Sequence, residues 1–107
     1  MAATIKNLAE GQLPNSKTTL YTVPALTSAV VLNVVCVNKD TVTRTHNLYY
    51  KKSGGTSRLL TAENQQIQAK YKSTVEEKIT MGAGDQIEGD ASAATIVDYV
   101  ISGVERT

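Results

Sequence analysis

Two stretches near opposite ends of the chain have the pattern of β-strands, and they most restrict the folds open to it. They are Lys17–Pro24 and Val97–Glu105. In the second, Val97, Tyr99 and Ile101 recur at every second position, which is the period of a strand with one buried face. Proline ends the first stretch, since it cannot donate to a ladder of hydrogen bonds. With no helical period between these stretches, the chain is predicted to be all-β.

Turns rich in Gly, Asp and Asn separate further strand patterns between these two. The adjacent Gly54 and Gly55 indicate a hairpin, because glycine readily takes the positive φ angles of a tight reversal. We expect one antiparallel β-sandwich or jelly-roll-like domain over residues 17–107. The predicted strands are Lys17–Val23, Ser28–Asn38, Val42–Lys52, Ser57–Thr61, Tyr71–Met81, Gln86–Gly89 and Thr95–Val104, with a polar loop at Ala62–Ala69.

Residues 1–16 are expected to form an extended N-terminal arm or an irregular edge segment rather than a core strand. They contain Gly11 and Pro14, and their apolar pattern is brief, limited to Ile5 and Leu8. Such arms are disordered or become ordered against a neighbouring subunit. Removal of residues 1–12 is therefore expected to leave the fold intact.

The segment Ser28–Asn38 is apolar at both odd and even positions. Val31, Val35 and Val37 share one parity, and Val30, Leu32, Val34 and Cys36 share the other. A strand that is apolar on both faces is predicted to be buried twice, once by the sandwich core and once by a loop, an arm or a partner chain.

Charge and cysteine content exclude several classes of protein. The formal net charge is +1, whereas a nucleic-acid-binding domain normally has a strongly basic face, so we expect no nucleic-acid partner. The single cysteine, Cys36, cannot form an internal disulfide and fits a reducing cytoplasm. The first residues lack the apolar core of a secretion signal. The apolar run Ala29–Val37 is much shorter than a membrane helix, so no membrane partner is expected.

Few residues suggest catalysis. His46 is the single histidine, and with Cys36 it would form a nucleophile–base pair if the two met. Cys36 lies among valines, however, where a thiol is usually a buried hydrophobe with a raised pKa. We therefore expect a non-enzymatic protein with no catalytic residues.

Three other groups suggest binding, and each has an ordinary structural explanation. The carboxylates Asp85, Glu88 and Asp90 would suit Ca²⁺, but their spacing matches no EF-hand and turns use Asp for local hydrogen bonds. The segment Gly54–Ser57 lacks the lysine and helix of a phosphate-binding loop, so a hairpin is expected. Adjacent Tyr49 and Tyr50 point to opposite faces, so at most one of them could join Tyr71 in a sugar platform. No metal or cofactor residues are assigned.

Several segments together have the character of one family, over most of the chain from Gly11 onward. They are Gly11–Ser16, Thr19–Ala25, Leu48–Tyr50 with Ser53–Arg58, Gly82–Gly89 and Val97–Glu105. These segments resemble small β-sandwich accessory proteins of tailed-bacteriophage virions, both decoration (cement) and tail-associated. The resemblance implies no catalytic or binding residues.

The resemblance implies a virion structural protein assembled in the cytoplasm of a host bacterium. As a decoration protein, it would stabilise the mature shell, with the major capsid protein and copies of itself as partners. The alternative is a neck, tail or fibre-associated sandwich protein that contacts host glycans. A cysteine hydrolase using Cys36 and His46 is the third and least favoured hypothesis.

Overall fold

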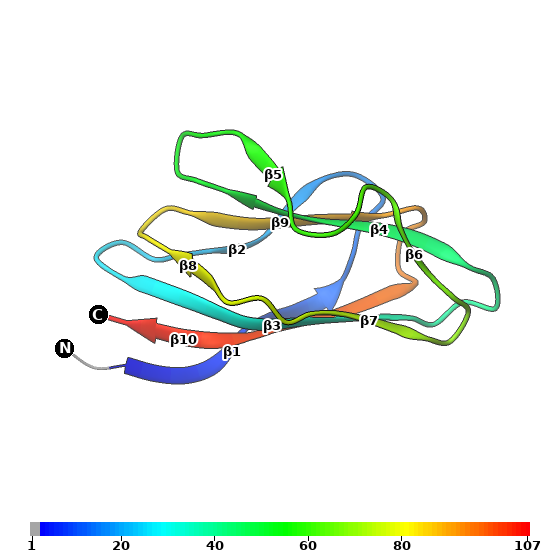
Figure 1. The fold of residues 1–107 in the computed structure, drawn as a ribbon, viewed down its shortest axis with the longest axis horizontal. Helices are drawn as coiled ribbons and strands as arrows, with labels where there is room; N and C mark the ends of the chain where they lie inside the picture. Colours follow the sequence, from blue (N-terminus) through cyan, green and yellow to red (C-terminus); the bar gives the residue numbers. More distant parts are fainter. Residues whose placement is uncertain (1–2) are drawn as a thin grey trace.

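The computed structural model describes residues 3–107 and contains two five-stranded antiparallel sheets, packed face to face (Figure 1). The fold class predicted from the sequence is confirmed. Sheet A contains β1 (Ala3–Gln12), β10 (Val97–Arg106), β3 (Ser28–Asn38), β7 (Lys72–Val75) and β8 (Ile79–Met81). Sheet B contains β2 (Thr18–Thr22), β9 (Gln86–Ala91), β4 (Arg44–Lys51), β5 (Ser57–Leu59) and β6 (Gln65–Ile67).

The strand order is that of a jelly roll. Strands from the first part of the chain pair with strands from the second part in nested order: β1 with β10, β2 with β9, β3 with β7 and β8, and β4 with β5 and β6. The pairs β10·β3 and β9·β4 join these hairpins into the two sheets. The chain is thus a long hairpin wrapped into a sandwich, the arrangement found in many viral capsid and lectin domains.

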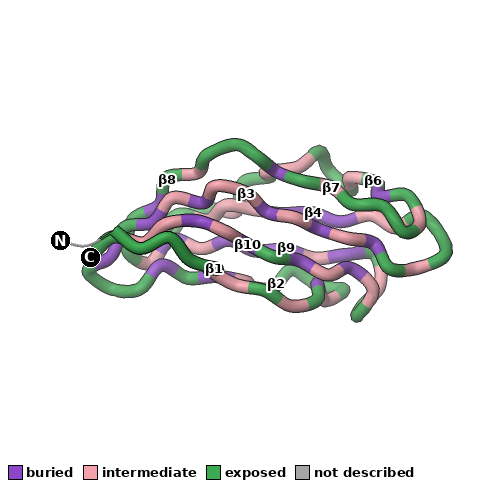
Figure 2. The backbone as a smooth tube through the Cα atoms, turned by 90° about the horizontal axis from the view of Figure 1, so that it is seen from below, coloured by how far each residue is buried: buried purple, intermediate pink, exposed green. Residues whose placement is uncertain are grey.

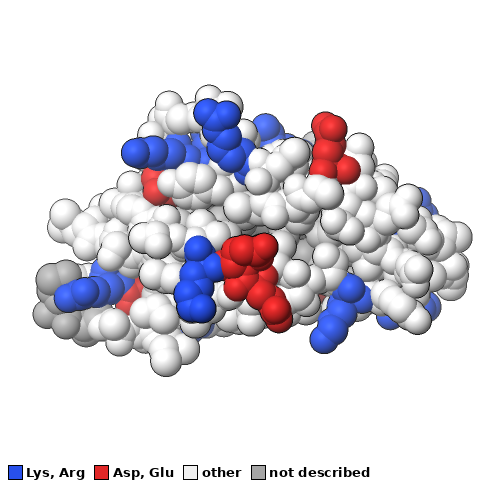
Figure 3. All heavy atoms as spheres, in the orientation of Figure 1, with Lys and Arg blue, Asp and Glu red and all other residues white. Residues whose placement is uncertain are grey.

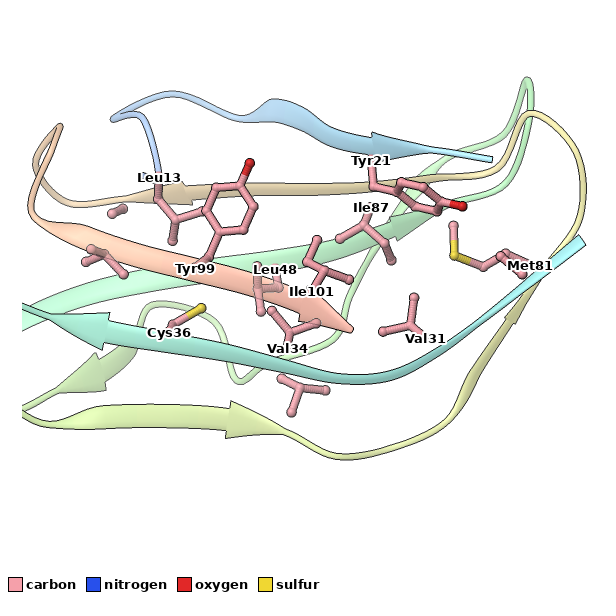
Figure 4. Packing of buried hydrophobic residues seen from close by; sticks show 14 of the residues in the cluster. Leu13, Tyr21, Val31, Val34, Cys36, Leu48, Met81, Ile87, Tyr99 and Ile101 are labelled. Carbon is pink, nitrogen blue, oxygen red and sulfur yellow. The ribbon is translucent and has the colours of Figure 1, made fainter. Parts of the chain in front are cut away.

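The core lies between the sheets and is made mostly of branched aliphatic side chains. Val34 and Ile101, which are opposite each other in the β3·β10 ladder, are fully buried. Leu48 and Ile87 meet them from sheet B (Figure 4). With no Phe or Trp in the chain, Tyr21 and Tyr99 supply the large aromatic volume. Burial of these side chains is the main favourable term in folding.

The expected N-terminal arm is corrected by the structure. Ala3–Gln12 forms the edge strand β1, paired with β10 along its length with one register shift beside Leu8. The next residue, Leu13, is fully buried. The pairing depends on β10 at the other end of the sequence, so local composition did not indicate it. Met1 and Ala2 lie outside the described residues. Removal of residues 1–12 is now expected to destabilise the fold.

Two predicted segments differ in detail from the structure. Tyr71–Met81, predicted as one strand, is divided into β7 and β8, which pair with successive parts of β3. The charged residues Glu76 and Glu77 fall in the break and are exposed, so neither of these carboxylates enters the core. Part of Ala62–Ala69, predicted as a loop, forms β6, because Ile67 is buried beside β4.

Candidate interaction surface

The outer face of sheet A is apolar along its centre. We define this apolar outer face as Ile5 of β1, Val30, Leu32, Val35 and Val37 of β3, and Val100 and Val104 of β10. Figure 2 views the sandwich from the side of sheet A, where β3 and β10 alternate between buried and half-buried residues. Ile5 is 82% exposed and Val100 is 40% exposed. The other five residues are half-buried, and the polar pair Asn33–Ser102 crosses the face between Val35 and Val30. Partly exposed apolar surface on one face of a sheet is a candidate site of protein association.

An irregularity in β3 explains how both parities of this strand are apolar. The register against β10 shifts between the pairs Asn33↔Ser102 and Val31↔Gly103, so Leu32 is an extra residue. Val31 and Val34 are both fully buried, and the two residues between them lie on the outer side. This bulge keeps one row of β3 side chains in the core and places the other row on the outer face.

The outer face of sheet B is mostly polar, and its polar side chains bond to one another; Leu59, opposite Tyr49, is an exposed aliphatic residue on it (45%). Asp90 accepts hydrogen bonds from the Tyr49 hydroxyl (3.1 Å) and from Asn47 Nδ2 (2.9 Å). Lys17 Nζ lies 5.0 Å from the centre of the Tyr49 ring and donates to Ser57 Oγ (3.3 Å). Partial burial, followed by the nearby Asp90 charge, raises the pKa of Tyr49. These groups satisfy one another, so this face has little unmet bonding capacity.

Cys36 and His46 both face the core, one from each sheet, and no hydrogen bond joins them in residues 3–107. Burial raises the pKa of the Cys36 thiol to about 12, so it remains protonated near neutrality. Burial also lowers the pKa of His46. His46 Nδ1 lies 3.2 Å from the carbonyl oxygen of Gln65, while Nε2 has no hydrogen-bond partner among the described residues. A neutral thiol and a buried imidazole do not make the activated pair of a cysteine hydrolase.

The three carboxylates considered for Ca²⁺ are separated by the fold. Asp85 lies in the β8–β9 turn, where it accepts hydrogen bonds from Ser53 N (2.8 Å), Gly82 N (2.9 Å) and the Tyr50 hydroxyl (2.8 Å). The bonds from backbone N–H groups lower its pKa, the one from Ser53 most. Asp85 thus ties two turns together, a structural role that needs no cation.

Glu88 and Asp90 lie on the outer face of sheet B, where Glu88 accepts a bond from Ser57. Within residues 3–107, no three His, Cys, Asp or Glu side chains are arranged to hold a metal ion. The same part of the chain contains no pocket and no helix long and apolar enough to cross a membrane.

The tyrosines do not form one platform. Tyr49 faces outward on sheet B, whereas Tyr50 faces the core side and donates to Asp85, as their opposite parity predicted. Tyr71 is 63% exposed and precedes β7 in sheet A. The segment Ser53–Thr56 forms the β4–β5 hairpin turn, with Gly54 at φ +71°. The hairpin interpretation of the paired glycines is confirmed.

The strand order defines the class of protein as a jelly-roll domain. The sequence matches no known protein-family profile, and no curated protein matches it significantly. A chain in the acid-stable capsid of Helicobacter pylori bacteriophage KHP30 has a similar fold, with 14% identity and a TM-score of 0.54. The match covers 98% of this chain and 87% of that one.

Two structures of infectious bursal disease virus are similar as well. The Gx strain matches with 13% identity and a TM-score of 0.51, and a crystal structure of the viral particle with 9% identity and a TM-score of 0.51. Each match covers 97% of this chain, but only 32% and 29%, respectively, of the viral chain. This chain therefore shares its fold with part of those proteins. At these identities the likeness concerns architecture, and function must be argued from the surfaces.

Proposed function

We propose that this protein is a non-enzymatic structural protein of a tailed-phage virion, and specifically a decoration protein that stabilises the mature capsid shell. The apolar outer face of sheet A is the observation that carries the proposal. It is built on two long central strands, and its residues are half-buried or exposed in the described chain. A face of this kind suits a protein that works by contact with a large partner surface.

The shared fold with a chain of the KHP30 capsid structure supports the same proposal, since jelly rolls are common in shells. A protein that binds only the assembled lattice stabilises it by its binding free energy, so no chemistry at a pocket is required. The partners would be the major capsid protein and further copies of this chain. Assembly would take place in the host cytoplasm, where the buried free Cys36 has no need of a disulfide partner.

The copy number in purified virions tests the proposal. Quantitative mass spectrometry would measure this protein relative to the major capsid protein. A ratio near unity would support a place on the shell lattice, whereas a ratio of a few per hundred would favour the neck, tail or fibres. Absence from the particle would overturn a virion role of either kind.

A further inference from the structure

The turn between β2 and β3 combines an unfavourable backbone with an unusually exposed apolar side chain. Leu26 has φ +58°, and its side chain is 94% exposed, the highest value among the large hydrophobic residues of 3–107. A bulky residue is a conformational outlier at such a φ, where glycine or asparagine would fit at lower cost. The other non-glycine residues with positive φ in this part of the chain are polar: Asn64, Lys70 and Thr95.

The turn is held rigidly on both sides of Leu26. On one side, Val23 is buried, its N–H donates to the carbonyl of Asp85 (3.0 Å), and its own carbonyl accepts from Gly84 N (3.0 Å). On the other side, Thr27 is 8% exposed, and its hydroxyl donates to the carbonyl of Ala25 (3.1 Å). Residues on both sides of Leu26 are thus anchored by burial or by backbone hydrogen bonds, while Leu26 itself is exposed.

Leu26 lies at one end of the sandwich, in the turn between β2 of sheet B and β3 of sheet A. Ile5, Val104 and Val30 form one row across the end of that sheet. Beyond the row, Arg106 pairs with Ser28, two residues from Leu26. Arg106 is exposed and takes part in none of the ion pairs of residues 3–107. This end of the molecule thus presents an apolar tip beside a free cation.

We propose that Leu26 is an anchor residue that inserts into an apolar socket, bordered by carboxylates, on the shell protein to which this chain attaches. The inference rests on the proposed function and names the residue that would make the attachment. A positive φ at an exposed bulky residue is accounted for if the side chain acts in binding. Buried apolar anchors of this type commonly dominate the energetics of protein interfaces. A lipid surface is less suited, because membrane-binding segments combine larger apolar faces with clusters of cations.

Two substitutions separate binding from folding. Leu26→Gly removes both the side chain and the strain, and Leu26→Asn keeps a residue tolerant of positive φ while making it polar. Thr95→Gly is the matched control, because Thr95 has φ +64° in the β9–β10 turn at the opposite end of the sandwich. Each variant would replace the wild-type protein during phage growth, and its copies per virion would be counted. Chemical unfolding of each purified variant would run in parallel.

We expect both Leu26 variants to unfold no more easily than wild type, yet to fall at least tenfold in copies per virion, while Thr95→Gly keeps full occupancy. If the Leu26 variants reach the same number of copies per virion as wild type, the role of Leu26 as an anchor is overturned, and the proposed function still stands. If the wild-type protein is absent from virions, both the anchor role of Leu26 and the proposed function are overturned. A Leu26-dependent dimer in analytical ultracentrifugation, or Leu26-dependent flotation with phosphatidylethanolamine–phosphatidylglycerol vesicles, would overturn the shell protein as the partner.

Discussion

The outer faces of the two sheets are both built from antiparallel strands, but their outward side chains differ in polarity. On sheet B, the outward side chains bond to one another, as in the contacts of Asp90 with Asn47 and Tyr49. On sheet A, the outward positions of β3 are largely aliphatic, and Val35 lies opposite Val100, although β10 also turns Asp98 and Ser102 to this face. A face whose polar groups bond to one another can remain in water at little cost in free energy. An apolar face, in contrast, is stabilised when a partner covers it. The difference suggests which side of the molecule meets its partner.

The largest expected effect separates the core from the apolar outer face on a single strand. Ile101→Ala, in the core, should lower the free energy of unfolding by about 3 kcal/mol. Val100→Ala, on the adjacent outward residue, should lower it by less than about 1 kcal/mol. Urea unfolding of both variants measures the difference. Equal losses would mean that the outer face is buried within the monomer, contrary to the comparison.

A charge placed on each face compares them as binding surfaces. Val35→Lys introduces a cation at the centre of the apolar outer face and should lower copies per virion about thirtyfold, because an unpaired charge would be buried on attachment. Thr19→Lys, on the outer face of sheet B, should leave occupancy unchanged. Both variants should remain folded by circular dichroism. Loss of occupancy by Thr19→Lys alone would reverse the assignment of the faces.

Removal of one carboxylate from each face compares their hydrogen bonding. Asp90→Ala leaves the Tyr49 hydroxyl without its acceptor and leaves the buried Asn47 amide with Asn64 Oδ1 (3.1 Å) as its remaining acceptor, so it should cost about 1.5 kcal/mol. Asp98 on sheet A makes an exposed ion pair with Lys39 at 3.4 Å, and Asp98→Ala should cost less than about 0.5 kcal/mol. Thermal unfolding at matched pH measures both. A similar cost for the two would show that the bonds on sheet B contribute little.

The smallest expected effect is a pH dependence that arises from sheet B. Burial lowers the pKa of His46 from its ordinary value of 6.5, so the unfolded chain binds a proton more readily than the folded chain. Stability should therefore fall as pH decreases below about 6.5, until the pH passes the pKa of the folded state. The imidazole is the only one in the chain, so His46→Gln should flatten the profile between about pH 7.5 and 5.5. An unchanged slope would assign the effect to carboxylates.

Local patterns predicted most of the strands, because alternation and turn residues act within a few positions. Ser28–Asn38 was predicted with the bounds that β3 has, and the glycines of Gly54–Gly55 indicated their hairpin. Failures occurred where pairing with a distant strand decided the structure. The segment Ala3–Gln12 has a weak pattern of its own, yet it forms β1 because β10 offers it an edge. One sequence pattern predicted the candidate surface, namely the apolar residues on both parities of Ser28–Asn38. No sequence pattern predicted the exposed Leu26.

The sequence alone determined that the chain is all-β, roughly where its strands lie, and that Val97, Tyr99 and Ile101 share a face. Tertiary structure decided which strands are neighbours, the bulge at Leu32, and which apolar row remains outside. Gly103 illustrates the reason: a Cβ added there would clash with the carbonyl oxygen of Val30, a contact that exists only after β10 pairs with β3. Strand propensity depends on near neighbours in the chain, but register and face depend on residues far away in sequence.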